Sequence, residues 1–107
     1  MKQLVQDFTK QLDEAKDIAL KAVISKSENI RNIVITGLGG SGIGGTIVSE
    51  LVAGSCTVPI TVNKDYFLPA FVDQHTLLVV CSYSGNTEET LSAMQQGIIK
   101  KATIVCI

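Results

Sequence analysis

The sequence lacks an excess of charge, a long apolar run and any cysteine pair spaced for metal or redox chemistry. Its formal net charge of −1 gives no reason to expect nucleic acid or an anionic membrane as a partner. No apolar run is long enough for a membrane span, and the N-terminal residues MKQLVQDFTKQLDEAKD are too polar for a signal peptide. The three cysteines are typical of reduced thiols in a cytoplasmic protein. The 107 residues, 46% of them hydrophobic, suit a single globular domain at most.

A change in the spacing of hydrophobic residues divides the chain into a leading segment, residues 1–28, and a body, residues 29–107. In the leading segment apolar residues recur at steps of three and four, which predicts an amphipathic helix over residues 3–26. The body instead has short runs rich in β-branched residues, at 32–36, 60–63, 76–82 and 103–107. Their continuous apolar character predicts strands that are covered on both faces, as in a parallel sheet.

Two helical patterns, residues 43–53 and 87–101, separate these runs. The link between the second and third strands is short and is expected to hold only a turn of helix near PAFV. The body therefore reads β-α-β-β-α-β, an open, doubly wound parallel α/β sheet. The chain ends at Ile107 without a helix to cover its fourth strand, so we expect the N-terminal portion of a longer protein, or a chain that needs a partner.

A glycine-rich stretch, GLGGSGIGG at residues 37–45, follows the first predicted strand. It is not a P-loop, because the lysine that neutralises the β and γ phosphates is missing after both possible GxxxxG spacings. A dinucleotide is harder to exclude, since Gly37, Gly39 and Gly42 fit GxGxxG. The acidic residue expected at the end of the second strand comes late, at Asp65. So dense a glycine loop satisfies the pattern easily by chance.

A second unusual loop, SYSGNTEET at residues 82–90, follows the third predicted strand. If the strand order is 2-1-3-4, the winding direction reverses between strands one and three, and both loops flank one crevice. The second loop carries Ser82, Ser84 and Thr87 around Gly85 and leads into a helix. Hydroxyls and free backbone N–H groups at a helix start suit a compact phosphate dianion. A pyrophosphate on the first loop would not need this second cluster.

Simpler roles exist for these polar residues. Thr87 or Asn86 can be an ordinary N-cap, and Asn86 with Glu89 resembles a capping box. One cap, however, does not need three hydroxyls. Glu88 would repel a nearby phosphate, so we expect it to point back along the helix. Lys64 can be a phosphate partner or a solvated loop residue.

Together these segments resemble the sugar isomerase (SIS) domain family, in the branch of isomerases that act on phosphorylated hexoses. The resemblance rests on IRNIVITG, GLGGSGIGG, VPITVNKDYFLPAFVD and SYSGNTEETLSA, and it runs from about Asn29 to the C-terminus. It implies that residues 1–107 are the N-terminal part of one SIS domain. It further implies aldose–ketose exchange between glucose 6-phosphate or mannose 6-phosphate and fructose 6-phosphate through an enediol.

The resemblance also implies roles for particular residues. The phosphate would be held by Ser82, Ser84 and Thr87, and Gly40 and Ser41 would line the same site. It implies no nicotinamide and no obligatory metal, and a cytoplasmic homodimer acting in glycolysis and gluconeogenesis. The base and the ring-opening histidine would come from a second SIS domain, so no catalytic residue is expected in this chain. Two other functions stay open, a non-catalytic sugar-phosphate sensor and a dinucleotide-binding oxidoreductase domain.

Overall fold

The computed structural model describes residues 2–23 and 29–107. Its elements are α1 (Lys2–Lys21), β1 (Asn32–Thr36), α2 (Gly40–Leu51), β2 (Ile60–Asn63), β3 (Thr76–Val80), α3 (Glu88–Ile99) and β4 (Thr103–Cys106). The strands form one parallel sheet in the order β2-β1-β3-β4. The predicted α/β fold and strand order are thereby confirmed.

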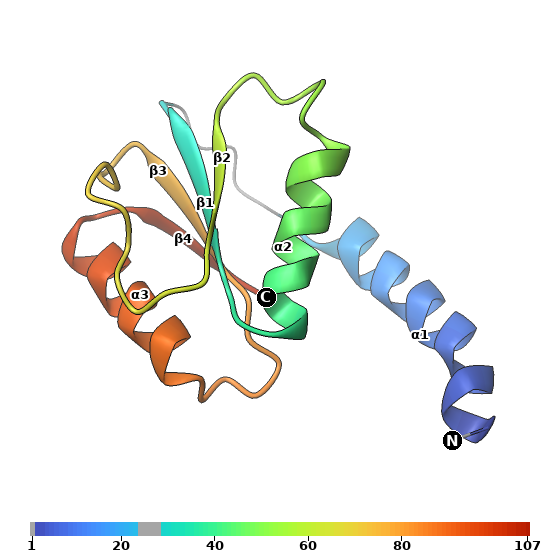
Figure 1. The fold of residues 1–107 in the computed structure, drawn as a ribbon. Helices are drawn as coiled ribbons and strands as arrows, with labels where there is room; N and C mark the ends of the chain where they lie inside the picture. Colours follow the sequence, from blue (N-terminus) through green and yellow to red (C-terminus); the bar gives the residue numbers. More distant parts are fainter. Residues whose placement is uncertain (1, 24–28) are drawn as a thin grey trace.

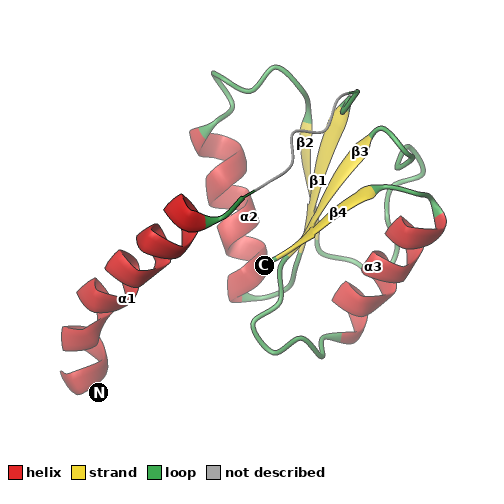
Figure 2. Ribbon diagram, turned by 180° about the vertical axis from the view of Figure 1, so that it is seen from behind, coloured by secondary structure: helices red, strands yellow, loops and turns green. Residues whose placement is uncertain are grey.

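The two body helices cover opposite faces of the sheet (Figures 1 and 2). Helix α2 packs on β1 and β2, and α3 packs on β3 and β4. This arrangement follows from the strand order. The crossovers β1-α2-β2 and β3-α3-β4 run in opposite directions across the sheet, and two right-handed crossovers of opposite direction cover different faces. The direction of winding therefore reverses between β1 and β3.

The hydrophobic core lies on the α3 face of the sheet. It consists of strand residues Val34, Leu78 and Val80, Ala93 of α3, and Leu68 and Val72 of the link between β2 and β3. The link thus fills space that a crossover helix would otherwise fill. The turn of helix predicted near PAFV is a single hydrogen-bonded turn, in which the Val72 N–H donates to the Pro69 carbonyl at 3.2 Å.

The opposite face of the sheet is covered only in part. Beside α2 lies an apolar cleft of about 650 Å³, whose walls include Ile33, Ile35, Leu77 and Val79 of the sheet and Val48 of α2. The prediction of strands covered on both faces is therefore wrong for this side, because within the described residues α2 alone packs there. The cleft is the apolar patch expected for a sheet that lacks a covering helix.

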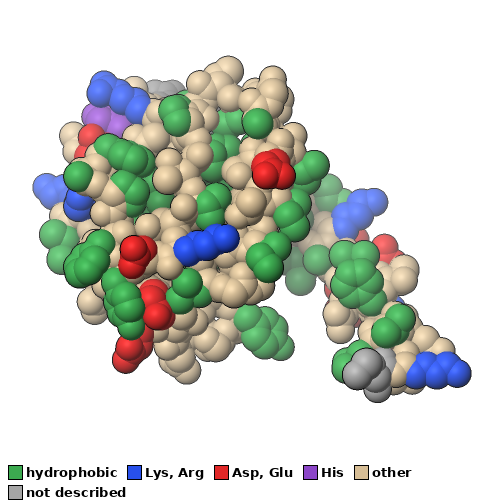
Figure 3. Space-filling view, viewed as in Figure 1, with side chains coloured by type: hydrophobic (Ala, Val, Ile, Leu, Met, Phe, Trp, Pro, Cys, Tyr) green, Lys and Arg blue, Asp and Glu red, His purple; other side chains and the backbone are tan. Residues whose placement is uncertain are grey.

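Helix α1 extends away from the sheet, and none of its residues is buried (Figures 1 and 2). Its apolar side chains face solvent, among them Leu4, Phe8 and Leu12, and hydrophobic surface shows on this arm in Figure 3. The helix ends at Lys21, five residues before the predicted end; residues 24–28 of the expected leading segment lie outside the described residues. Among the described helices, none is long and apolar enough to cross a membrane.

The close packing of α3 on the sheet depends on Gly97. A Cβ at this position would collide with Cδ2 of Leu78, which is completely buried. We expect Gly97→Ala to lower the free energy of unfolding by about 1–3 kcal/mol, the usual cost of overpacking a core. Urea denaturation measures this effect, with Gly54→Ala as the control because a Cβ there meets nothing within 4 Å. Equal midpoints for the two variants would contradict the prediction.

Candidate phosphate-binding site

The two unusual loops begin side by side at the carboxyl edge of the sheet. Thr36 of β1 pairs with Val80 of β3, and the Cys81 N–H donates to the Thr36 carbonyl at 2.9 Å. The chain then leaves β1 into the glycine loop and β3 into the serine loop. In open α/β sheets, ligands bind outside the carboxyl ends of the strands where the winding reverses, and this is that point.

The glycine loop is a tight turn that runs directly into α2. The Gly37 N–H donates to the Asn63 carbonyl at 3.2 Å, and the N–H groups of Ser41 and Gly42 both donate to the Leu38 carbonyl. Gly39, the N-cap of α2, has φ 57° and ψ −129°, a conformation that residues with a Cβ rarely adopt. Helix α2 therefore begins at Gly40, three residues before the predicted start.

A buried polar pair fixes the ends of β1 and β2 below this loop. Asn63 Nδ2 donates to Thr36 Oγ1 at 3.2 Å and to the Asp65 carbonyl at 3.1 Å. Both side chains are buried, so each amide hydrogen bond replaces one that water would otherwise make. The pair holds the start of the glycine loop and the start of the β2–β3 link against each other.

The serine loop is held by hydrogen bonds from its own hydroxyl groups. Ser82 Oγ accepts from the Gly85 N–H at 2.9 Å, and Ser84 Oγ accepts from the Asn86 N–H at 3.2 Å. Ser84 Oγ also lies 3.5 Å from Thr87 Oγ1. Two hydroxyls that would act together on one ligand are thus neighbours before any ligand arrives.

The two loops enclose an open depression with a volume of about 480 Å³. It is lined by Leu38, Gly40, Ser41, Tyr83, Ser84 and Thr87. The structure therefore brings together four of the five residues that the sequence predicts for the site. Tyr83 also lines the depression, and its side chain is fully exposed. Leu38 was missed, because nothing but its place among the glycines marks it.

Ser82, the fifth predicted residue, does not line this depression. It lines a separate hollow of about 300 Å³ together with Thr90, Met94 and Ile107. Its hydroxyl is engaged by the Gly85 N–H, so its role within the loop is to close the turn. Any contact between Ser82 and a ligand therefore stays a prediction.

The simple capping interpretation of the serine loop does not fit the geometry. Thr87 is the N-cap of α3, yet its side chain makes no capping hydrogen bond. Among the hydrogen bonds of the described residues, none joins Asn86 and Glu89 in a capping box. The Thr87 hydroxyl and the first N–H groups of α3 are thus available to a ligand. The start of a helix favours the binding of an anion.

Glu88, the carboxylate expected to oppose an anion here, is hydrogen bonded to a tyrosine. The Tyr66 hydroxyl donates to Glu88 Oε2 at 3.1 Å, and Ser92 Oγ and Gln96 Nε2 both donate to the Tyr66 carbonyl. The hydrogen bond to Glu88 raises the pKa of Tyr66, with smaller effects of desolvation and of Glu89. Figure 3 shows acidic surface over the start of α3. As expected, Glu88 is not among the residues that line the depression.

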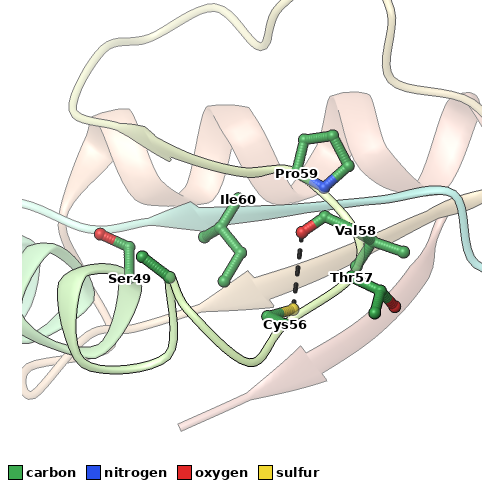
Figure 4. Close-up of a pocket in the computed structure, with 7 residues that line it drawn as sticks. Ser49, Cys56, Thr57, Val58, Pro59 and Ile60 are labelled. Atoms are coloured by element: carbon green, nitrogen blue, oxygen red, sulfur yellow. Dashed lines mark hydrogen bonds between the residues drawn. The ribbon is translucent and has the colours of Figure 1, made fainter.

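Other parts of the described structure offer weaker sites. Figure 4 shows a hollow of about 300 Å³ at the opposite edge of the sheet, where Cys56 Sγ donates to the Val58 carbonyl at 3.5 Å. Its polar side chains are those of Ser49, Cys56 and Thr57, and no charged side chain lines it. His75 also lies at that edge, with Nδ1 3.1 Å from the Asn29 carbonyl. Within residues 2–23 and 29–107, no group of three or more metal-ligating side chains comes together.

The cysteines are free thiols, and they do not contribute to the depression. Burial raises the pKa of Cys81, which keeps this thiol protonated and weakly reactive. Asp65, the late acidic residue of the dinucleotide pattern, accepts the Tyr66 N–H at 2.8 Å. That contact turns its carboxylate towards the link and weakens the dinucleotide interpretation.

Comparison with known proteins agrees with this geometry. The chain is 47% identical over 104 residues to a bifunctional phosphoglucose/phosphomannose isomerase of Caldicellulosiruptor bescii, covering 96% of this chain and 31% of that protein. It is 43% identical over 101 residues to the enzyme of the same name from Thermoplasma acidophilum, covering 94% of this chain and 32% of that protein. The chain is related to the bifunctional phosphoglucose/phosphomannose isomerases. It spans about a third of the length of these relatives.

A solved structure shares the fold. A crystal structure of a proposed phosphosugar isomerase from Clostridium difficile 630 superposes with a TM-score of 0.65 at 19% identity, covering 98% of this chain and 28% of that one. No protein-family model matches the chain. The resemblance to sugar isomerases drawn from the motifs is thus confirmed, whereas the roles of individual site residues stay predictions.

Proposed function

We propose that this chain forms the phosphosugar-binding part of an aldose–ketose isomerase. The enzyme would interconvert glucose 6-phosphate or mannose 6-phosphate with fructose 6-phosphate. In this proposal the phosphate sits in the depression, where it accepts hydrogen bonds from Ser84, Thr87 and Ser41 and from N–H groups at the starts of α2 and α3. The observation that supports it best is the depression between the glycine and serine loops.

The reaction itself needs groups that the depression does not contain. A base must move a proton between C1 and C2 of the open-chain sugar, through an enediol, and another group must open the ring. Among the described residues, neither a carboxylate nor an imidazole lines the depression. We therefore propose that these groups come from another part of a longer, cytoplasmic, homodimeric enzyme of glycolysis and gluconeogenesis. This chain alone would bind the sugar phosphate without turning it over.

The same observation supports a second function, a module that senses sugar phosphates without catalysis. Both functions require the phosphate to bind at this depression, and they differ in whether a base is supplied. Aldose–ketose exchange assayed with the full-length gene product separates them. An inactive full-length protein that still binds fructose 6-phosphate would favour the sensor.

Binding is tested by thermal shift of the 107-residue chain with fructose 6-phosphate and, separately, with NAD. A ligand present at a hundred times its Kd stabilises the folded state by about 2.7 kcal/mol. We expect fructose 6-phosphate to raise the melting temperature and NAD to leave it unchanged, because the second loop suits one compact phosphate. A shift with NAD alone would contradict the proposal and favour the dinucleotide interpretation.

A further inference from the structure

We propose that Lys64 supplies the positive charge that balances the phosphate of the bound sugar, an inference that rests on the proposed function. The sequence left this residue open between a phosphate partner and a solvated loop residue. Neither hydroxyl groups nor backbone N–H groups neutralise a dianion formally, so a cation nearby would add to its binding. Among the described residues, one is suitably placed.

The backbone of Lys64 is fixed beside the glycine loop. Lys64 directly follows β2, whose last residue, Asn63, pairs with Thr36 of β1. Asn63 makes two further hydrogen bonds that fix this part of the chain. Its carbonyl accepts the Gly37 N–H, and its side-chain amide donates to the Asp65 carbonyl. The lysine therefore leaves the sheet at the same edge and next to the same turn as the proposed site.

The side chain of Lys64 lies against the first turn of α2. Its Cε is 3.3 Å from the place where a Cβ on Gly42 would be, so the space that the lysine occupies depends on Gly42. The ammonium group is one bond beyond Cε. The side chain thus contacts the helix turn that contains Gly40 and Ser41, which line the depression, although Lys64 is not itself a lining residue.

The start of helix α2, against which Lys64 lies, repels a cation and attracts an anion. A cation near the N-terminus of a helix meets the positive end of the helix dipole, a repulsion of about 0.3–1 kcal/mol at an exposed site. Helix α2 has no acidic residue in its first turn to relieve it. The carboxylates of Asp65 and Glu88 are oriented by hydrogen bonds from Tyr66, although they keep their negative charge. A phosphate between Lys64 and the helix turn would convert the repulsion into attraction.

The remaining described basic residues lie elsewhere. Arg31 precedes β1, and Lys100 and Lys101 precede β4, so these three are at the amino edge of the parallel sheet. The others in the described ranges, Lys2, Lys10, Lys16 and Lys21, belong to α1. Within residues 2–23 and 29–107, Lys64 is thus the basic side chain at the carboxyl edge, where the depression opens.

The test compares Lys64→Met with Lys64→Arg and with Lys100→Met, a matched loss of charge at the other edge of the sheet. Affinity of the 107-residue chain for fructose 6-phosphate and for inorganic phosphate is measured by NMR titration at low and moderate salt. We expect Lys64→Met to weaken both ligands about tenfold at low salt, with less loss at higher salt. Lys64→Arg should bind within about twofold of wild type, and Lys100→Met should be unchanged.

A second measurement separates charge balance from a structural role. Without ligand, Lys64→Met should unfold at the same or a slightly higher denaturant concentration, because the repulsion from the helix is gone. Wild-type affinity in Lys64→Met, combined with weakened binding in Ser84→Ala/Thr87→Ala, would overturn the role of Lys64 and leave the proposed function standing. Failure of the wild-type chain to bind either ligand would overturn both. A lowered unfolding midpoint in Lys64→Met with unchanged affinity would make the lysine structural.

Discussion

Replacing Ser84 and Thr87 together by alanine should weaken the binding of fructose 6-phosphate by about tenfold to a hundredfold. Both hydroxyls face the depression, and their oxygens are 3.5 Å apart, close enough to contact one phosphate together. A hydrogen bond to a charged group contributes about 1.5–3 kcal/mol, and water replaces part of that at an open site. Isothermal titration calorimetry on the 107-residue chain and the variant measures the change.

The same double variant should remain as stable as the wild type to within about 1 kcal/mol. The Thr87 hydroxyl does not cap α3, and the variant gives up two exposed hydrogen bonds, the one from the Asn86 N–H and the long one between the two hydroxyls. Ser55→Ala is the matched control, because its exposed hydroxyl bonds only locally to the Val52 carbonyl, at the other edge of the sheet. Loss of stability with unchanged affinity would show that Ser84 and Thr87 serve the helix start alone.

The strands were well predicted because their sequence signal is local. Runs of β-branched residues placed β1 and β2 at their observed bounds, 32–36 and 60–63. The third strand was predicted two residues too long. The Cys81 N–H still donates to Thr36 of β1, and the Ser82 N–H to Ile107, the residue after β4. The extended pattern therefore continues beyond the end of β3 at Val80.

The start of α2 could not be found in the same way. Its first turn contains glycine and serine, residues with low helix propensity and without an apolar period. What places the turn there is tertiary packing: a Cβ on Gly45 would come within 2.8 Å of Ile35 Cγ2, so glycine allows α2 to approach β1. The pattern of one sequence shows that glycines are dense but not which of them face the sheet.

The sequence predicts that the two loops meet, but it does not predict which of their side chains contact one another. Strand order alone brought residues near 40 and near 84 to one edge, which the lining of the depression bears out. The inward turn of Ser82 depends on the fold of its own loop, where Gly85 has φ 73°. The hydrogen bond between Tyr66 and Glu88 joins residues 22 positions apart, through a link whose path the sequence did not define.

Replacing Gly39 by alanine should both destabilise the chain and disrupt the site, whereas Gly44→Ala should do neither. At φ 57° and ψ −129°, Gly39 has a backbone conformation that costs a residue with a Cβ on the order of 1–3 kcal/mol. The variant can relieve this strain only by rotating the turn, which would move the N–H groups of Gly40 and Ser41 away from the depression. We therefore expect a lower unfolding midpoint together with weaker fructose 6-phosphate binding.

Gly44 is the internal comparison because it lies five residues further along, in the helix that the same turn begins. A Cβ on Gly44 meets nothing within 4 Å, and alanine favours a helix interior over glycine by about 0.5–1 kcal/mol. Gly44→Ala should thus raise the midpoint of urea denaturation and keep wild-type affinity. If Gly39→Ala instead bound fructose 6-phosphate as tightly as Gly44→Ala, the geometry of the glycine turn would not matter for the ligand. The phosphate would then have to be held by the serine loop alone.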